Sequence, residues 1–328
     1  MPAQQPDFSN NRFSLTVVSR SKSAGLTRFN VDTKDRYHRR RYRLERQLFA
    51  AFTNQLQRYL GRRPHIDFDH PKNFVRRLVY LPPGIRAWSA YMPGGLATYS
   101  VHNPEHKRLA GGKKVDYMTR ALFRHSTDAL GIRSRAYVLS YLVAKIAEVE
   151  RPKSLRWLSL ASGSGQPVYD TVDDLPEVSF EVTITDYDQA SLDFAKAVYR
   201  FERPHVKKMA FEQLDVLAGS RLEELIDKTK PELIDAMGLF EYLRPSAAAE
   251  LIKRIYDRLP VGSELIFTNM SSDNPHRDLH QRGLGWPGVI TRSVAEVADI
   301  LENAGISAAS VEVYSPTDRV YNVYRVVR

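Results

Sequence analysis

The chain of 328 residues contains no cysteine. This absence excludes disulfide bonds, thiolate metal ligands and cysteine nucleophiles. No apolar run approaches the roughly 20 residues that a membrane-spanning helix needs, and residues 1–11 are polar, without the hydrophobic segment of a signal peptide. Internal repeats and low-complexity tracts are also lacking, which excludes solenoid architectures. We therefore expect a cytoplasmic protein with no membrane span, built from one large α/β domain and a smaller one.

Acidic residues are scarce in the first part of the sequence. Residues 1–150 contain 27 lysines and arginines against 11 acids, whereas residues 151–328 contain 21 against 27. A basic half can attract an anionic small molecule, a membrane surface or a nucleic acid, although a solvated basic face explains the same composition. Arginines alternate with aromatic residues in 37–43, but only composition favours nucleic acid there. We favour an anionic small molecule as partner over nucleic acid, and the sequence leaves the oligomeric state open.

The most informative segment begins at Trp157. An apolar strand pattern ends in Ala161-Ser162-Gly163-Ser164-Gly165, and about twenty residues later a second strand pattern ends at Asp186. Glycines allow the backbone to turn tightly and to approach a ligand, and an acid after the next strand can accept hydrogen bonds from both ribose hydroxyls. This spacing indicates a nucleoside-binding βαβ unit.

A third glycine would separate two classes of nucleoside cofactor. The dinucleotide fingerprint Gly-x-Gly-x-x-Gly requires glycine where this chain has Val168. Because that glycine brings the helix N-terminus close to a pyrophosphate, its absence disfavours a dinucleotide and favours S-adenosylmethionine. An NAD-dependent oxidoreductase remains an alternative.

The chain divides into four predicted parts. They are a disordered tail (1–11), a basic N-terminal domain or lid (12–127), a connecting helix (128–150) and a cofactor-binding domain (151–328). Within the N-terminal part, the patterns predict a hairpin in residues 13–31, a helix in 35–60 that stops at Gly61, a strand in 74–81 and an irregular connection in 85–112.

After Ser154, strand and helix patterns alternate. The predicted strands are residues 155–160, 180–185, 211–214, 233–237, 264–269, 309–314 and 320–327. Alternation of this kind builds a parallel sheet, and the last two strands lack a connecting helix, so one of them must run antiparallel. We expect an α/β fold: a Rossmann-like, seven-stranded, mostly parallel sheet with an antiparallel last strand, preceded by a smaller, mainly helical N-terminal domain.

Residues 150–328 resemble the class I S-adenosylmethionine-dependent methyltransferases in these motifs and their order. The resemblance implies that the glycine-rich loop passes under the methionine part of S-adenosylmethionine, that Asp186 binds the ribose, and that the residues after the later strands flank the adenine or line the cleft. Ser159 replaces the family's usual acid in the first strand, and Ala161 replaces the first glycine of the loop. The implied cofactor-binding residues are Ala161, Ser162, Gly163, Gly165, Asp186, Tyr187, Asp215, Val216, Met237, Gly238 and Leu239.

A narrower group is similar in residues 238–243, 274–277 and 131–135 and at Asn269 and Trp286. It comprises bacterial methyltransferases linked to methyl esters of 3-hydroxy fatty acids. This similarity implies a small-molecule or acyl acceptor with a carboxylate, which guanidinium groups would hold in bidentate fashion. The substrate-binding candidates are Arg133, Arg135, Arg277 and Arg292, each of which could instead pair with an acid of the protein.

The need for a base depends on the acceptor. A carboxylate needs none, whereas a hydroxyl or amine would need a proton acceptor, for which Tyr242, His276 and His280 are candidates. His276 and His280 lie four residues apart beside Asp273, but no third ligand has a fixed spacing, so we expect no metal. The sequence thus predicts an S-adenosylmethionine-dependent methyltransferase; the alternatives are an RNA methyltransferase and a non-catalytic Rossmann-like binding protein.

Overall fold

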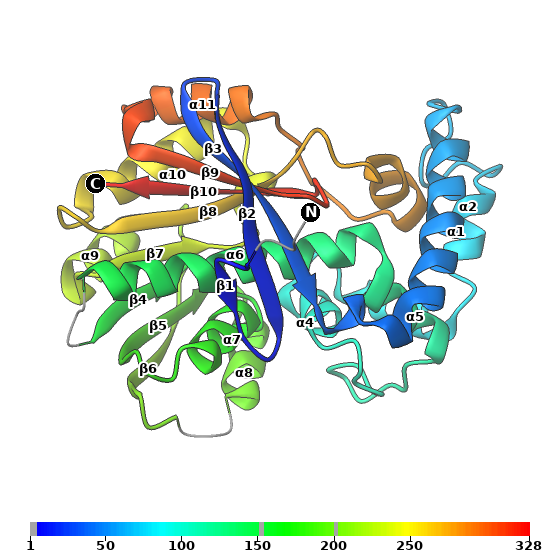
Figure 1. Ribbon diagram of the computed structural model, residues 1–328, viewed down its shortest axis with the longest axis horizontal. Coiled ribbons are helices and arrows are strands. Elements are labelled where there is room, and N and C mark those ends of the chain that lie inside the picture. The colour runs from blue at the N-terminus through cyan, green and yellow to red at the C-terminus, as the bar shows by residue number, and fades with distance from the viewer. Residues whose placement is uncertain (1–4, 151–153, 200–202) are drawn as a thin grey trace.

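The computed structural model describes residues 5–150, 154–199 and 203–328. A single mixed sheet with the strand order β1-β2-β3-β9-β10-β8-β7-β4-β5-β6 runs through the molecule (Figure 1). The strands are β1 (Phe8–Ser9), β2 (Phe13–Ser23), β3 (Leu26–Asp35), β4 (Leu155–Ser159), β5 (Phe180–Asp186), β6 (Val206–Gln213), β7 (Leu233–Ala236), β8 (Glu264–Met270), β9 (Val311–Pro316) and β10 (Tyr321–Val327).

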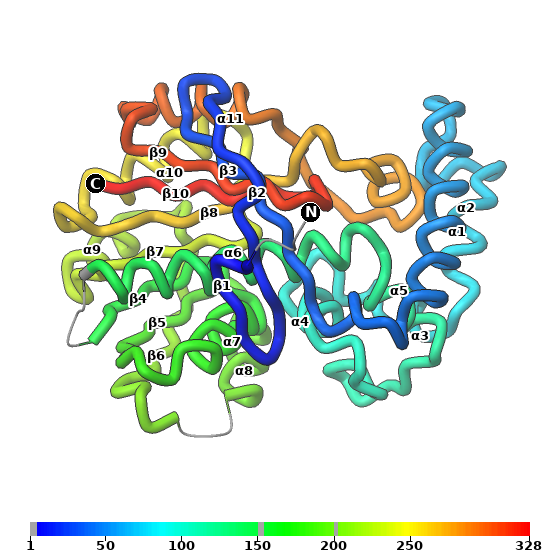
Figure 2. Tube along the Cα trace, in the orientation of Figure 1, coloured from blue at the N-terminus to red at the C-terminus, as the bar shows by residue number. Residues whose placement is uncertain are grey.

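The sheet has ten strands, not the predicted seven. Strands β4 to β10 overlap the predicted segments, although β6 begins at Val206 and not at 211. β10 runs antiparallel to β8 and β9, as its short connection to β9 requires. The additional three strands come from the N-terminal region. The hairpin of β2 and β3 lies beside β9, to which β3 is parallel, and β1 pairs with β2 (Figure 2). The hairpin supplies hydrogen bonds to β9 that an edge strand would lack, so the N-terminal region contributes to the sheet as well as supplying the helices α1 to α5, within residues 43–125.

Helices cover both faces of the sheet. On one face, α9 (Arg221–Thr229), α10 (Pro245–Arg258) and α11 (Val294–Asn303) share a core with β7 and β8. On the other face, α6 (Thr127–Glu150), α7 (Gln166–Asp174) and α8 (Gln189–Val198) pack with β2, β4 and β5. Since both faces are covered, the central strands β7 and β8 are buried along their whole length.

A third core lies beyond the end of the sheet, where Figure 1 shows α1, α2 and α5 grouped together. Its elements are α1 (Arg43–Gly61), α2 (Phe74–Val79), α3 (Pro83–Trp88), α4 (Gly95–His102), α5 (Tyr117–His125) and a π-helical turn, η5 (Leu279–Leu284). The N-terminal part of α6 joins this core to the sheet, because Ala129 and Ile132 pack in it while Val138 and Leu142 pack against the strands.

Two local predictions were wrong. Residues 74–81, predicted as a strand, begin with the helix α2. The Asn73 side chain caps this helix by accepting a hydrogen bond from the Arg76 N–H, and Val75 and Val79 are buried on one helical face. In so short a segment, the four-residue spacing of apolar residues in a helix is hard to distinguish from the alternation of apolar and polar residues in a strand. Residues 85–112, predicted to be irregular, contain most of α3 and all of α4. The helix predicted in 35–60 begins later, at Arg43, after two 3-10 turns, and ends at Gly61 as expected.

No helix in the described ranges combines the length and the apolar composition that crossing a bilayer would take.

Candidate active site

Four parallel strands end side by side, and the predicted cofactor-binding residues follow them. β7, β4, β5 and β6 are neighbours in this order and run in the same direction. Residues 237–239, 161–165, 186–187 and 215–216 come directly after or near their carboxyl ends. The chain proceeds from β4 outward to β6 and then returns to the other side of β4 with β7, and such a switch point is where open α/β sheets bind ligands. The fold therefore collects these residues at one sheet edge.

The loop after β4 has an unusual backbone. Ala161, Gly163 and Gly165 all adopt positive φ angles, of 49°, 56° and 70°. The Ser162 N–H donates to the Thr185 carbonyl, and its hydroxyl donates to the Ser159 carbonyl at 3.0 Å, so the loop is fixed across the ends of β4 and β5. Alanine in this region costs roughly 1–2 kcal/mol relative to the right-handed conformation. Ala161 therefore keeps a left-handed conformation although it carries a Cβ.

Asp186 faces this loop from the end of β5. Its side chain is buried, its Oδ2 accepts a hydrogen bond from the Gly163 N–H at 2.7 Å, and its Oδ1 accepts one from the Asp188 N–H at 3.0 Å. Burial raises the pKa of Asp186, although the two backbone N–H groups act in the opposite direction. The carboxyl group is thus held in one orientation between the loop and α8.

The remaining predicted cofactor residues have diverse surroundings. Tyr187 is 72% exposed, and Asp215 is exposed while its Oδ1 accepts from the Leu217 N–H. Val216 is buried. Gly238, with a φ angle of 124°, lies against the Arg135 guanidinium: an ideal Cβ built on it would be 3.1 Å from Nη2. Side chains that could flank a planar ring are therefore at the surface, and the loop after β7 is packed on α6.

Helix α4 covers the glycine-rich loop, and the sequence did not predict this contact. An ideal Cβ on Gly95 would lie only 2.3 Å from Cα of Gly163, so the two backbones are in contact. At the end of α4, the Asn103 side chain donates a hydrogen bond to Oε1 of Gln166 at 3.1 Å. The Tyr99 and Phe194 rings pack edge to face, with their centroids 4.9 Å apart. The pair Gly94-Gly95 was the only sequence signal, since adjacent glycines often mark a close backbone approach. Residues 95–103 therefore form one wall of the site.

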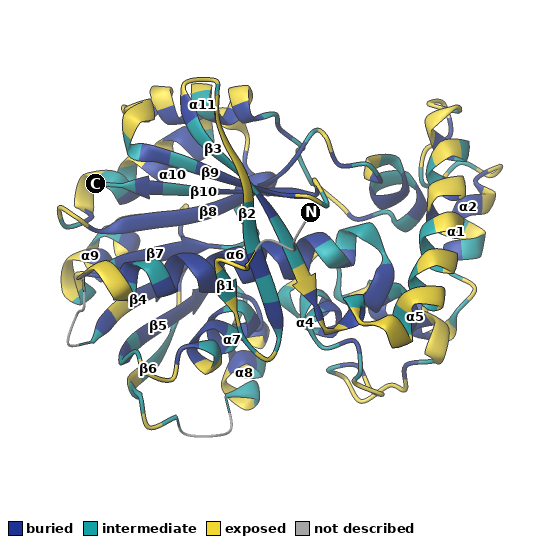
Figure 3. Cartoon of the chain, viewed as in Figure 1, coloured by how far each residue is buried: buried dark blue, intermediate teal, exposed yellow. Residues whose placement is uncertain are grey.

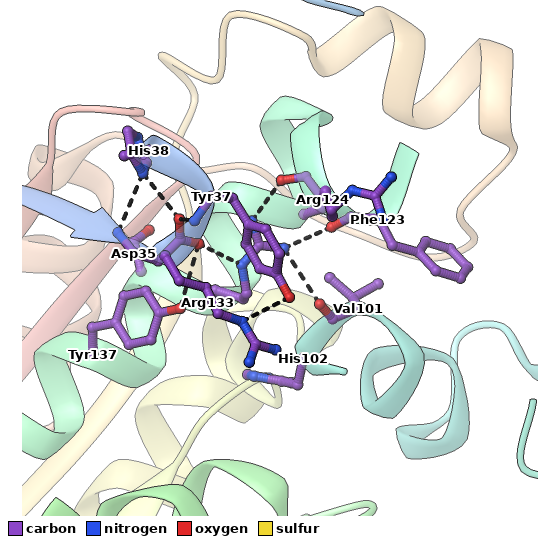
Figure 4. A network of polar contacts seen from close by, with 12 residues as sticks. Asp35, Tyr37, His38, Val101, His102, Phe123, Arg124, Arg133 and Tyr137 are labelled. Carbon is purple, nitrogen blue, oxygen red and sulfur yellow. Dashed lines mark hydrogen bonds and ion pairs between the residues drawn. The ribbon is translucent and has the colours of Figure 1, made fainter. Parts of the chain in front are cut away.

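Arg133, a predicted substrate ligand, is fully engaged inside the protein (Figure 4). Its Nε donates to Asp35 Oδ2 at 2.9 Å, and its Nη atoms donate to the carbonyls of Phe123 and Arg124 at 2.6 and 2.7 Å. Burial opposes ionisation of Asp35, but the Arg133 guanidinium keeps the pKa of that carboxyl well below its ordinary value. Arg133 thus joins the end of β3 to the C-terminal end of α5.

The three other candidate arginines do not converge on one point. Arg135 pairs with Glu241 at 3.1 Å beside Gly238, and Arg292 donates to the Phe240 carbonyl and to Asn269 Oδ1. Arg277 is exposed. Of the four, Arg135 is the one in contact with the predicted cofactor loop.

A cavity of about 450 Å³ lies among α1, α2, α5, α6 and η5. Its walls are mostly aromatic and aliphatic, and include Phe49, Leu56, Trp88, Ile132 and Trp286. Apolar cavities with a few polar groups are the usual binding sites for small molecules.

His280 and Asp128 are the polar pair in the wall of this cavity. The His280 Nδ1 lies 3.2 Å from Asp128 Oδ2, and the imidazole is only 2% exposed. Burial alone would raise the pKa of Asp128, but His280 and Asn274 lower it. In the described part of the chain, the His280 Nε2 has no hydrogen-bond partner. A polar atom buried in this way is costly unless a ligand or water completes its hydrogen bonding.

The cavity adjoins the loop after β7 through Trp286. The His280 ring stacks on Trp286 at 5.6 Å, and the indole N–H donates to the Tyr242 hydroxyl at 2.7 Å. Tyr242 ends a 3-10 turn (Phe240–Tyr242) that directly follows Leu239. Of the catalytic candidates, Tyr242 and His280 thus both contact Trp286. The third candidate, His276, instead contacts Asn54 Oδ1 of α1 through its Nε2. Sequence reasoning missed Asp128, whose signal was its place at the start of a strongly apolar helix.

No family model and no curated protein sequence matches the chain. Solved structures are similar to it. A possible exported protein from Bordetella parapertussis has 14% identity and a TM-score of 0.55, over 84% of this chain and 96% of the other. The magnesium protoporphyrin IX methyltransferase of Synechocystis, with bound SAH, has 15% identity and a TM-score of 0.49 over 74% and 98%. Human N-acetylserotonin methyltransferase, in complex with SAM, has 14% identity and a TM-score of 0.44 over 70% and 66%. At such identities the likeness is one of fold.

Proposed function

We propose that the chain is an S-adenosylmethionine-dependent methyltransferase that acts on an apolar, acyl-type small molecule. The observation that supports this most directly is the pairing of Asp186 with the left-handed loop at Gly163. A buried carboxylate at the end of the second parallel strand, next to a loop without bulky side chains, suits a ribose diol and the chain attached to it.

The residues at this edge fit the cofactor. Asp186 would accept hydrogen bonds from the ribose, and residues 161–165 would support the methionine part. The exposed Tyr187 would flank the adenine, and Asp215 would accept a hydrogen bond from its amino group. Because Gly95 is in contact with Gly163, entry of the cofactor requires the first turn of α4 to move away from the loop. Residues 95–103 then act as a lid, a role in keeping with the lid expected within residues 12–127.

The apolar cavity is the acceptor site in this proposal. Its lining suits a hydrocarbon chain or ring. Among the described residues that line it, the buried side-chain polar atoms without a hydrogen-bond partner are the two ring nitrogens of His280. Nδ1 lies beside Asp128, which leaves Nε2 for a ligand. A hydroxyl or carboxyl group of the acceptor would therefore be directed toward His280.

Bound S-adenosylmethionine supplies a methyl group on a sulfonium, whose transfer to an acceptor oxygen leaves S-adenosylhomocysteine. For a hydroxyl acceptor, His280 Nε2 takes up the released proton, and Asp128 orients the imidazole through Nδ1 and stabilises its charged form. For a carboxylate acceptor no proton is released, and no base is needed. The surrounding apolar walls exclude water from either reaction.

Calorimetry with S-adenosylmethionine tests the cofactor site. We expect the wild-type protein to bind it and Asp186→Ala to lose at least tenfold in affinity, because the ribose loses its acceptor. Asp193→Ala, which removes an exposed carboxylate of α8, is the matched control and should bind as the wild type does. Titration with NAD in parallel tests the oxidoreductase alternative. Equal affinities of wild type and Asp186→Ala, or binding of NAD instead, would contradict the proposal.

A further inference from the structure

One end of the molecule carries a group of exposed apolar side chains. Leu44 and Leu48 on α1 are 68% and 61% exposed, and Phe52, Leu81, Tyr117 and Met118 are also exposed. These six residues are called the cavity rim below. Single exposed apolar residues are common on proteins, but a contiguous group marks an interaction surface.

The cavity rim is one continuous surface. Leu44, Leu48, Phe52, Tyr117 and Met118 line a groove of about 490 Å³ between α1 and α5. Phe52, Met118 and Leu81 also line the apolar cavity, so the groove leads into it. Figure 3 shows exposed residues along the outer sides of α1 and α2, which project beyond the end of the sheet. The rim therefore surrounds the entrance to the cavity.

Positive charge is concentrated in the segments that carry most of the rim. Residues 36–86 contain thirteen lysines and arginines and only three acids. Arg43, Arg58 and Arg62 are exposed on or next to α1, as are Arg77 on α2 and Arg86 on α3. Glu45, the one acid in these three helices, pairs with the buried Arg124 at 2.6 Å. The surface thus offers apolar side chains and arginines with little competing negative charge.

We infer that the cavity rim docks onto an anionic lipid bilayer, from which apolar ligands reach the cavity. Leu44, Leu48 and Phe52 enter the boundary between headgroups and acyl chains, and exposed arginines of α1 to α3 pair with lipid phosphates. A two-fold contact between two copies of the chain would instead bring the arginines of both copies together. A nucleic acid would leave the aliphatic rim in water. Docking itself depends only on the surface, whereas the delivery of an acceptor rests on the proposed function.

Cosedimentation with vesicles tests the inference without any need for catalysis. We expect the full chain to bind vesicles of phosphatidylcholine with phosphatidylglycerol, to bind phosphatidylcholine vesicles at least tenfold more weakly, and to dissociate as salt is added. The double variant Leu44→Asp/Leu48→Asp should lose at least tenfold in binding to the anionic vesicles. Val261→Asp, at a position that is 89% exposed and distant in the sequence, is the control and should bind as the wild type does.

Three results would overturn the inference. They are no binding of wild type to anionic vesicles, equal binding of wild type and the double variant, and a dimer in solution that the double variant converts to monomer. Circular dichroism of each variant verifies that it is folded, so that lost binding reports on the surface. Cofactor affinity is measured separately with Asp186→Ala. The absence of vesicle binding would therefore contradict the membrane inference alone, and the absence of cofactor binding would contradict the proposed function alone.

Discussion

Gly95 and Gly163 are in backbone contact across the edge of the sheet, although they are far apart in the sequence. Each is a position at which any Cβ would meet main-chain atoms, since an ideal Cβ on Gly163 would lie 2.6 Å from Cα of Gly95. The contact joins α4 to the loop that follows the first central strand, and the N-terminal region thereby becomes part of the candidate site.

Gly95→Ala should destabilise the protein, because its Cβ cannot fit without moving α4 from the loop. Overpacking of this kind typically costs about 1–3 kcal/mol, and we expect a correspondingly lower free energy of unfolding in denaturant titrations. Gly61→Ala is the control, since its Cβ would meet one side-chain atom at an ordinary 3.5 Å. If Gly95→Ala proves as stable as Gly61→Ala, the two backbones are not in contact.

Arg133→Met should be strongly destabilising, because it removes the guanidinium partner of the buried Asp35 and the donor to the carbonyls of Val101, Phe123 and Arg124. Breaking a buried ion pair by removing one partner costs about 3–5 kcal/mol. Arg156→Met removes an exposed arginine 3.5 Å from Glu232 and should cost less than about 1 kcal/mol. Thermal and denaturant unfolding of the two variants would show whether this order holds; a smaller loss at Arg133 would favour a role in ligand binding over a structural one.

Asp235→Asn should weaken the pH dependence of stability. Burial raises the pKa of Asp235 in β7 from 3.8 to about 7, against the hydrogen bonds from Ser159 and Trp157. Because the folded state binds this proton more tightly than the unfolded state, its contribution to the free energy of unfolding decreases as pH rises from about 4 to 7, by roughly 1 kcal/mol per pH unit.

Asparagine cannot ionise, so Asp235→Asn should lose less stability than the wild type between pH 5 and pH 7. Denaturant titrations at both pH values measure this difference. The exposed Asp227→Asn is the control, and it should follow the wild type. Parallel pH curves for wild type and Asp235→Asn would show that Asp235 does not titrate in this range.

His280→Gln should lower kcat for alcohol acceptors about 10²- to 10⁴-fold, the usual contribution of a general base, and leave the affinity for S-adenosylmethionine unchanged. Asp128→Asn should cause a smaller loss, since it only positions the imidazole. Release of S-adenosylhomocysteine with a series of linear alcohols and fatty acids measures both, and exposed His65→Gln is the control. Unchanged turnover of alcohols by His280→Gln would remove His280 from the mechanism.

The sequence by itself determined the central part of the fold. Alternating apolar segments placed strands β4 to β10, and the missing helix before β10 predicted its antiparallel direction. The loop at Gly163 and the acid at Asp186 were also identifiable, because their spacing within one βαβ unit is a local property of the chain.

Only the tertiary structure decided which distant residues meet. The hairpin of β2 and β3 was expected, but its pairing with β9 depends on an open sheet edge that forms at the other end of the chain. The same holds for Gly95 on Gly163 and for Asp128 beside His280. Such contacts form where separate helices and loops pack together, and no local pattern of residues specifies them. The cavity and its rim arise in the same way, from helices that acquire a shared apolar space only when assembled.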